Sequence, residues 1–200
     1  MTDKRTIDTY NKSAKQLAEY FRGIGPRKKY IDYAFEKAGN PEAARVVEIG
    51  CGDGRDAKAI TERAGWYLGI DPSKELIKMA KAHVPNAKFV VGDAATYKYP
   101  SNIDIVFSFA SILHLDKGEL RATLSKISDA LKPGGVLYIS SKFRESFESG
   151  IKKDKYGERL FYFYNPDLVK ELAGDKYELI DTWKETVGHT EWFEIALRRI

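Results

Sequence analysis

The sequence has little of what disulfide-bonded, metal-binding and membrane-spanning proteins need. Its 200 residues include one cysteine and three histidines, so a disulfide framework is impossible and no ligand spacing predicts a metal site. No apolar run approaches the roughly 20 residues of a membrane span. The opening residues MTDKRTIDTY also lack the apolar region of a signal peptide. We therefore expect a cytoplasmic protein with no membrane contact and no metal.

The charge also lacks a strong bias. The formal net charge is +4, and 31% of the residues are charged while 43% are hydrophobic, which is typical of a folded globular protein. The basic excess lies within residues 1–45, mostly around Arg27, Lys28 and Lys29. These three side chains predict a solvated helix surface, with phosphate binding as the alternative, since dedicated nucleic-acid binders usually carry a basic stripe. A nucleic-acid partner is possible but less expected than a small molecule.

Hydrophobic periodicity predicts strands that alternate with helices. Two helices come first, and the earlier one carries Ile7, Tyr10 and Phe21 at helical spacing. The later strands are continuous apolar runs, which indicates a parallel sheet covered by helices on both faces. The predicted strands cover residues 45–50, 66–70, 88–91, 103–109 and 135–140, and the helices between them cover 55–64, 73–83 and 117–131. The chain thus predicts a doubly wound α/β fold.

The last part of the chain has a different pattern. Asn165 and Pro166 begin a short predicted helix. Two strand-like runs follow, near 177–185 and 190–198, joined by a turn near Gly188. So short a connection predicts an antiparallel hairpin at one end of the sheet.

The most informative segment is VVEIGCGDGRD, residues 46–56. Its glycines at 50, 52 and 54 leave a predicted strand and enter a helix, where missing Cβ atoms let a ligand approach the backbone amides. A nicotinamide dinucleotide site is the alternative, but its GxGxxG pattern needs the third glycine one residue later. Glu48, at the end of a buried strand, needs a donor such as a ligand ammonium group.

Carboxylates follow the next two predicted strands. Asp71 stands in GIDPS (69–73), where doubly wound folds present an acid to the ribose hydroxyls of a nucleotide. Asp93 stands in VGDAA (91–95), where it could accept a hydrogen bond from an exocyclic amine while Ala94 donates its amide. Taken singly, each acid is equally consistent with a turn residue, and Ser73 with a helix cap. Together they converge on the edge of the sheet that binds ligands.

The four motifs EIGCGDG, GIDPS, GDA and LKPGGVLYI, in this order and spacing, resemble the signature of class I S-adenosylmethionine-dependent methyltransferases. The resemblance covers about residues 42–140. It implies a seven-stranded sheet of order 3-2-1-4-5-7-6 with strand 7 antiparallel. It also implies one domain over residues 1–200, with a helical lid at 1–40, a cofactor-binding core at 42–140, and an acceptor segment with the closing hairpin at 141–200.

The resemblance also implies a cofactor site for S-adenosylmethionine. In it the glycine loop lies under the methionine part, Asp71 takes the ribose hydroxyls, and Asp93 with Ala94 takes the adenine. The first helix would close over the cofactor. The residues expected to contact it are Glu48, Gly50, Cys51, Gly52, Gly54, Asp71, Pro72, Ser73, Asp93, Ala94, Ser108, Tyr10 and Arg22.

The acceptor side is less defined. His114 follows the fourth strand and is the candidate general base, with pocket packing as the alternative. Residues 108–111, SFAS, do not match the NPPY-like box typical of family members that methylate planar amino groups of bases. Residues 141–164 combine Lys142, Arg144 and Arg159 with the aromatic run Phe161, Tyr162, Phe163 and Tyr164. This segment is either a packed strand edge or a lid that suits an anionic or aromatic acceptor.

The predicted function is direct methyl transfer to a small-molecule acceptor. Three alternatives stay open: an enzyme of the kind that completes wobble-uridine modifications in tRNA, a non-catalytic cofactor-binding partner subunit, and a nicotinamide dehydrogenase. The acceptor, its accepting atom and the oligomeric state do not follow from the sequence.

Overall fold

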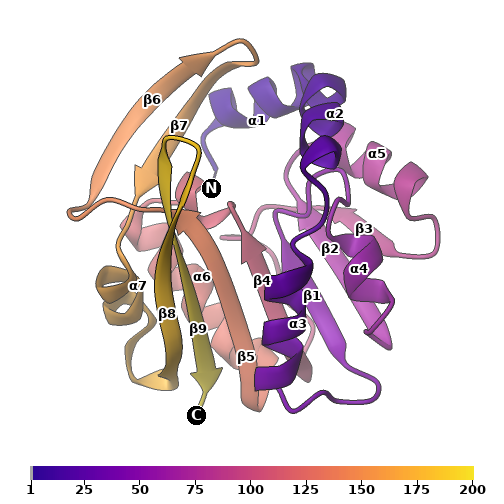
Figure 1. The fold of residues 1–200 in the computed structure, drawn as a ribbon, viewed down its shortest axis with the longest axis vertical. Helices are drawn as coiled ribbons and strands as arrows, with labels where there is room; N and C mark the ends of the chain where they lie inside the picture. Colours follow the sequence, from indigo (N-terminus) through magenta and orange to yellow (C-terminus); the bar gives the residue numbers. More distant parts are fainter. Residues whose placement is uncertain (1) are drawn as a thin grey trace.

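A seven-stranded sheet forms the centre of the protein, for which the computed structural model describes residues 2–200. Its strand order is β3-β2-β1-β4-β5-β9-β8 (Figure 1). All pairs from β3 to β5 are parallel, while β9 runs antiparallel to both β5 and β8. This confirms the predicted fold and strand order, in which β8 and β9 are the sixth and seventh strands of the sheet.

The strands are short where helices follow them and long in the closing hairpin. Their bounds are β1 Arg45–Ile49, β2 Trp66–Asp71, β3 Lys88–Val91, β4 Ile103–Phe109, β5 Leu131–Lys142, β8 Tyr177–Val187 and β9 Thr190–Arg199. The predicted bounds agree closely for β3 and β4. The predicted strand 135–140 is too short, because β5 begins directly after the preceding helix.

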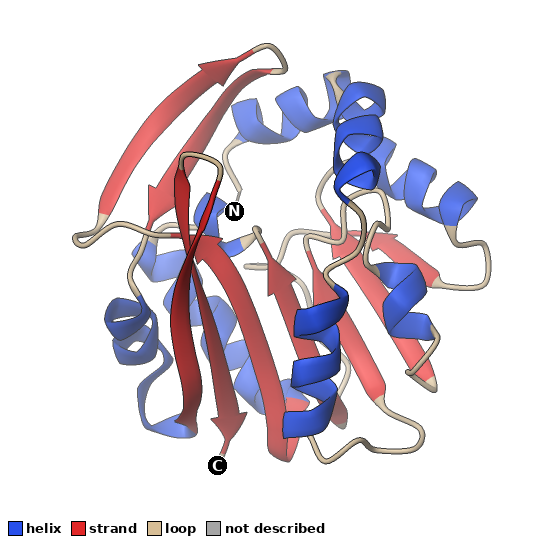
Figure 2. Ribbon diagram, viewed as in Figure 1, coloured by secondary structure: helices blue, strands red, loops and turns tan. Residues whose placement is uncertain are grey.

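Helices cover both faces of the sheet (Figure 2). Residues of α3 (Lys28–Lys37), α4 (Ala57–Thr61) and α5 (Lys74–His83) pack with one face, in a core that includes Phe35 and Phe107. Residues of α6 (Lys117–Ala130) and α7 (Pro166–Ala173) pack with the other, in a core that includes Val47 and Leu137. Helix α6 begins with a reciprocal capping box between Asp116 and Glu119.

The N-terminal part differs from the prediction of two helices. There are three before β1, because the apolar stripe through Tyr10 and Phe21 is divided between α1 (Lys4–Lys12) and α2 (Ala14–Ile24). The break falls at Ser13, whose hydroxyl donates to the carbonyl oxygen of Tyr156 at 2.6 Å. A tertiary hydrogen bond therefore ends α1 where helical periodicity alone would continue it.

Within the segment 141–164, interpreted from the sequence as a packed strand edge or a lid, residues 148–163 form a second sheet. Strands β6 (Glu148–Asp154) and β7 (Gly157–Phe163) pair antiparallel and project beyond the carboxyl ends of the main sheet. Helix α1 lies against β7: Thr9 Oγ1 donates to the carbonyl oxygen of Glu158 at 2.7 Å, and the Leu160 amide donates to Thr6 Oγ1 at 2.9 Å. This β6–β7 hairpin and α1 together cover the edge where β1, β2 and β4 end.

Candidate functional site

A cavity lies at the carboxyl ends of β1, β2 and β4 and holds about 940 Å³ of space free of atoms, including its open mouth. One wall of the cavity is formed by the glycine loop after β1 and by Asp71 at the end of β2. The other side is formed by α1 and the 3₁₀ turn η1 (Ile112–His114). Of the predicted site residues, the cavity is lined by Tyr10, Glu48, Gly50, Cys51, Gly52, Asp71, Pro72, Ala94 and His114.

Two glycines shape the floor of the cavity in different ways. Gly50 has φ +70°, and a Cβ built on it would lie 2.4 Å from Ser111 Oγ, so its neighbour excludes a side chain. Gly52 has φ +55°, and nothing lies within 4 Å of its Cβ position. The space above Gly52 is therefore open, which is what a ligand resting on the loop backbone needs.

Asp71 connects this loop to the start of α5. Its Oδ2 accepts from the Gly52 amide at 3.0 Å and its Oδ1 from the Ser73 amide at 2.8 Å. The side chain is buried, and burial raises the pKa of Asp71 to about 6. Each carboxylate oxygen keeps acceptor capacity, so Asp71 can also receive two ligand hydroxyl groups.

Glu48 is buried at the end of β1 and accepts from the Tyr67 hydroxyl at 2.5 Å. Burial, with the charge of Asp56 next, raises the pKa of Glu48 above its ordinary value. A positively charged group in the cavity would favour its ionised form. This is the environment predicted for an acid that meets a ligand ammonium.

Two acids of the glycine loop were missed by the sequence reasoning. Asp53 accepts from Arg22 Nε at 2.5 Å, and Asp56 accepts from the Arg27 amide and Nη1, both at 2.6 Å. Both acids line the cavity, as does Arg27, whose guanidinium lies 4.9 Å from the Phe109 ring centroid. Arg27 is therefore half-buried and paired with Asp56, whereas Lys28 and Lys29 are exposed, as predicted for a solvated helix surface. The sequence signal for these two ion pairs is the presence of acids in the glycine loop together with arginines before β1.

Five predicted contact residues lie behind the cavity wall. Gly54 packs against Ala80 and Phe89, and Arg22 reaches the cavity only through Asp53. Ser73 caps α5 and donates to Asn11 Oδ1 at 2.9 Å. The Ser108 hydroxyl is buried without a hydrogen-bond partner among the described residues. For these four the structure gives structural roles instead of direct contact with the cavity.

Asp93, the fifth, has both carboxylate oxygens engaged. Its Oδ2 accepts from the Thr2 amide at 2.6 Å and its Oδ1 from the Ala95 amide at 2.9 Å. Thr2 and Ala94 line the cavity, whereas Asp93 does not. Asp93 therefore holds the N-terminal segment in this arrangement, and Ala94 with Thr2 forms this part of the cavity wall.

His114 faces the cavity from η1 and is hydrogen-bonded on both ring nitrogens. Its Nδ1 lies 2.8 Å from the carbonyl oxygen of Leu160, and its Nε2 lies 2.9 Å from the Tyr10 hydroxyl. A carbonyl only accepts, so Nδ1 carries the proton and Nε2 accepts from Tyr10. Burial, with the charges of Arg159 and Lys142, lowers the pKa of His114 to about 4. At neutral pH the ring is uncharged and its lone pair is occupied.

A family model described as a methyltransferase domain matches residues 46–135, the segment that contains the glycine loop, Asp71 and Ala94. The chain therefore carries a methyltransferase domain of the class I S-adenosylmethionine-dependent type. A trans-aconitate 2-methyltransferase of Variovorax paradoxus is 32% identical over 102 residues, which are 50% of this chain and 39% of that protein. This methyltransferase chain thus spans about two-fifths of that relative.

Other relatives match over more of their length. An uncharacterised methyltransferase of Geobacillus kaustophilus is 27% identical over 180 residues, which cover 87% of this chain and 79% of that one. The solved magnesium protoporphyrin IX methyltransferase of Synechocystis, with bound S-adenosylmethionine, has a TM-score of 0.75 at 16% identity, covering 100% and 99% of the two chains. That likeness concerns the fold of the methyltransferase alone.

The cavity fits S-adenosylmethionine, the cofactor of this family. Gly52 leaves room on the loop for the methionine part, and Glu48 offers a buried acid for its amino group. Asp71 is placed for the ribose, and the small side chain of Ala94 leaves room for a flat base. Tyr10, an expected cofactor contact, and His114 form the wall of the same cavity on the side of α1 and η1.

Proposed function

We propose that this methyltransferase transfers a methyl group from S-adenosylmethionine to a small molecule that enters between the glycine loop and the Tyr10–His114 pair. The observation that carries the proposal is the cover over the site. Helix α1 is bonded to β7 on one side and to the start of α5 on the other. Since both bridges span the carboxyl ends of the strands, the acceptor space is enclosed and suits a compact molecule better than a polymer.

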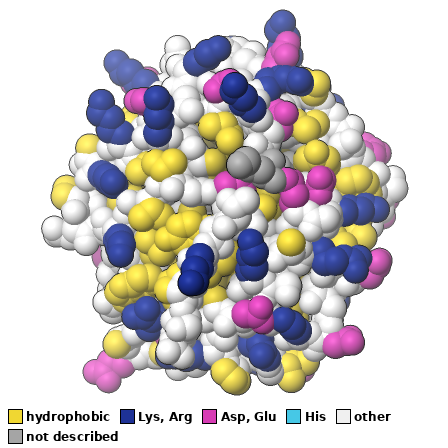
Figure 3. All heavy atoms as spheres, turned by 180° about the vertical axis from the view of Figure 1, so that it is seen from behind, with side chains coloured by type: hydrophobic (Ala, Val, Ile, Leu, Met, Phe, Trp, Pro, Cys, Tyr) yellow, Lys and Arg dark blue, Asp and Glu magenta, His cyan; other side chains and the backbone are white. Residues whose placement is uncertain are grey.

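The names of two relatives support a small acceptor. One acts on trans-aconitate and the other on magnesium protoporphyrin IX, and both compounds are metabolites. The surface gives no support for an RNA substrate. On the face drawn in Figure 3, the described Lys and Arg side chains are scattered and Asp and Glu lie among them, with no continuous basic stripe. Arg27, the best phosphate candidate from the sequence, is paired with Asp56.

Residues of the chain would act mainly by placement. When bound, S-adenosylmethionine supplies a methyl group on a positively charged sulfur, which is already electrophilic. Glu48 would hold the amino group, Asp71 the ribose and Ala94 the base, while α1 excludes water. Aligning two reactants in this way can contribute roughly 7–11 kcal/mol at most. His114 is a positioning residue in this proposal, because its Nε2 is occupied by Tyr10 and its pKa is about 4.

The test uses S-adenosylmethionine labelled in its methyl group. Purified protein is incubated with a metabolite extract below 1 kDa and, separately, with unmodified total tRNA. We expect label in the small-molecule fraction and formation of S-adenosylhomocysteine, with little change between 50 and 200 mM salt. Labelled tRNA and a steep loss of activity with salt would favour the tRNA alternative. Cofactor binding without any labelled product would favour a non-catalytic subunit.

A further inference from the structure

A group of basic side chains lies among aromatic rings between β5 and the β6–β7 hairpin. Lys142 Nζ is 4.4 Å from the ring centroid of Phe161, and the Arg159 guanidinium is 5.4 Å from the same centroid. Arg144 and Lys152 lie 5.1 and 5.9 Å from the neighbouring ring of Phe163. Four cations thus surround two adjacent rings, which concentrates positive charge at this place.

Arg159 is the buried member of the group. It is 9% exposed, and its Nη2 pairs with Asp154 on the neighbouring strand. Its Nε is buried and has no hydrogen-bond partner among residues 2–200. A buried guanidinium N–H without an acceptor is costly. An acceptor atom from a bound molecule would satisfy it.

Lys142 lacks a counter-charge. Within the described chain no carboxylate lies within 4.0 Å of its ammonium group, which lies 4.4 Å from the ring centroid of Phe161 and 6.0 Å from that of Trp192. Burial, followed by the charge of Arg159, lowers the pKa of Lys142. In the group as a whole, Arg159 pairs with Asp154 and Arg144 with Glu148, while Lys142 and Lys152 have no carboxylate within 4.0 Å among the described residues. The group therefore keeps a positive charge that favours an anion.

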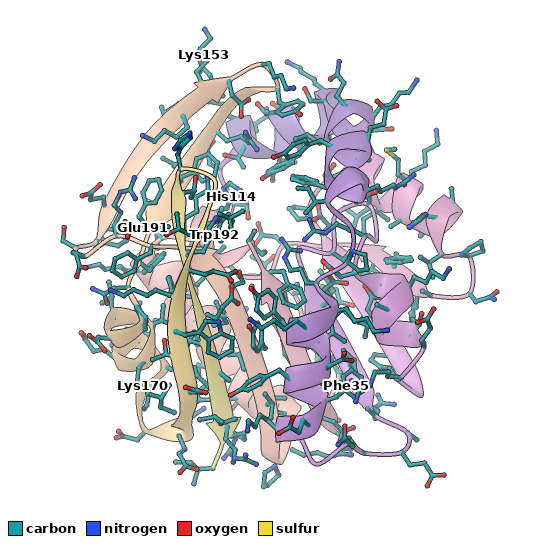
Figure 4. All side chains as sticks on the ribbon, in the orientation of Figure 1. Phe35, His114, Lys153, Lys170, Glu191 and Trp192 are labelled. Carbon is teal, nitrogen blue, oxygen red and sulfur yellow. The ribbon has the colours of Figure 1, made fainter. Side chains whose placement is uncertain are left out.

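The two cations adjoin the acceptor side of the cavity. The Arg159 guanidinium lies 5.5 Å from the ring centroid of Tyr10, and the Phe161 ring lies 4.9 Å from that of His114. Both Tyr10 and His114 line the cavity. In Figure 4, His114 and Trp192 lie close to each other beneath the hairpin, while Lys153 points outward from its tip. An anion held by Lys142 and Arg159 would therefore lie beside the proposed methyl-transfer position.

We propose that Lys142 and Arg159 form a binding site for a carboxylate group of the methyl acceptor, which is therefore a small organic acid. The inference rests on the proposed function and deepens it. A carboxylate, with one charge and two acceptor oxygens, matches one ammonium group and one free guanidinium N–H. In an acid with a second carboxylate, that group could also be the methyl-accepting oxygen. It is already ionised at neutral pH and needs no general base, which suits a site where the Nε2 of His114 is occupied by Tyr10.

The first test measures binding. Protein saturated with S-adenosylhomocysteine is titrated by calorimetry with succinate, fumarate and benzoate, with the corresponding amides, and with methyl phosphate. We expect at least one acid to bind ten times more tightly than its amide and more tightly than methyl phosphate. Lys142→Gln should weaken acid binding at least tenfold, Lys142→Arg should stay within threefold, and affinity for S-adenosylhomocysteine should not change.

Lys153→Gln is the matched control, because Lys153 is an exposed lysine of the same hairpin. It should leave acid binding unchanged. Amides that bind as well as acids, a tighter methyl phosphate complex, or equal binding by the Lys142→Gln variant would each overturn the proposal. A protein that methylates only neutral or cationic compounds would overturn the acid site and leave the proposed function. Acid binding with no transfer to any compound would instead refute the proposed function.

Discussion

Tyr10 and His114 are 104 positions apart in the chain, yet the Tyr10 hydroxyl lies 2.9 Å from His114 Nε2. This bond joins the helix α1 that covers the cavity to the turn that follows β4. With Nδ1 donating to Leu160, the imidazole is held in one tautomer and one orientation. The pair therefore fixes the wall of the acceptor space, and it makes that wall sensitive to acid.

The first prediction concerns stability against pH. The pKa of His114 is about 4 in the folded protein, against 6.5 for an exposed histidine. Because folding lowers the pKa, the neutral His114 ring contributes its full stabilisation of the folded protein above pH 6.5. That contribution is lost as the pH falls towards 4. Between pH 7 and pH 5 the loss should be about 2 kcal/mol in the free energy of unfolding. Urea titrations at both pH values measure it.

His114→Gln supplies the comparison, because glutamine has no charge to gain. Burial raises the pKa values of Asp71 and Glu194, to about 6 and about 7, and these groups act in the opposite direction. Asp71 and Glu194 remain in both proteins. Subtracting the loss of unfolding free energy in the variant from that in the wild type therefore leaves the contribution of His114. Equal losses in the two proteins would show that the imidazole is not held neutral.

The main sheet was predictable because its signals are local. Strands β3 and β4 are short apolar runs between polar turns, and Asp116 with Glu119 marks the start of α6. The helix break at Ser13 and the β6–β7 hairpin could not be predicted, because they depend on contacts between residues distant in sequence. Ser13 bonds to Tyr156, and residues 148–154 show no apolar alternation, since nearly all of β6 is exposed on both faces.

The second prediction concerns Asp71. Asp71→Asn removes a charge-assisted acceptor for the ribose and places an amide donor against the amides of Gly52 and Ser73. S-adenosylmethionine should bind about 2–4 kcal/mol more weakly. Calorimetry at pH 7.5 measures this, with Asp167→Asn, at the exposed start of α7, as the control. Unchanged affinity would contradict the ribose assignment.

The third prediction also follows from Asp71, whose pKa is about 6. The ionised carboxylate is the better acceptor, so cofactor affinity should fall as pH drops through 6, by about tenfold between pH 7.5 and 5. The Asp71→Asn variant should lack this component of the pH dependence. The same slope in both proteins would assign the effect to another group, such as Glu48.

The fourth prediction separates the two glycines of the loop. Gly50→Ala and Gly52→Ala both force alanine into a left-handed conformation, at about 1–2 kcal/mol each. Gly50→Ala also meets Ser111 Oγ at 2.4 Å, which adds about 1–3 kcal/mol, while Gly52→Ala meets nothing within 4 Å. Thermal unfolding should therefore find Gly50→Ala clearly less stable.

Ligand binding should rank the same variants differently. Gly52→Ala should fold yet lose most affinity for S-adenosylmethionine, because its methyl group enters the space that the cofactor needs. Ser111→Gly should restore part of the stability of Gly50→Ala, since it removes the clashing side chain. Normal cofactor affinity in Gly52→Ala would mean that the cofactor does not rest on this residue.

The candidate site was predictable as far as the motifs reach. Glu48 and Asp71 lie at the carboxyl ends of β1 and β2, and Ala94 follows β3, so the fold alone brings them to one edge. The roles of Arg22 and Arg27 could not be predicted. Arg22 pairs with Asp53 and Arg27 with Asp56, each about 30 positions away, and only the folded chain brings them together. The same holds for Asp93, because its hydrogen bond with the Thr2 amide joins residues 91 positions apart.

The last prediction concerns α1 as the cover of the cavity. Asn11 Oδ1 accepts from Ser73 Oγ at 2.9 Å and from the Glu75 amide at 3.3 Å, which holds α1 to the start of α5. If the cofactor leaves only when α1 moves away, Asn11→Ala should speed its dissociation about fivefold, which corresponds to about 1 kcal/mol for one hydrogen bond. Stopped-flow dissociation measures this.

Lys12→Ala is the control, because Lys12 is the exposed neighbour of Asn11 on the same helix. It should leave the dissociation rate unchanged. Hydrogen exchange adds an independent readout: the amides of α1 should lose protection in Asn11→Ala, while those of β4 keep theirs. Faster exchange in α1 without faster dissociation would show that the cofactor leaves by a path that does not require this helix to open, and that α1 covers the acceptor alone.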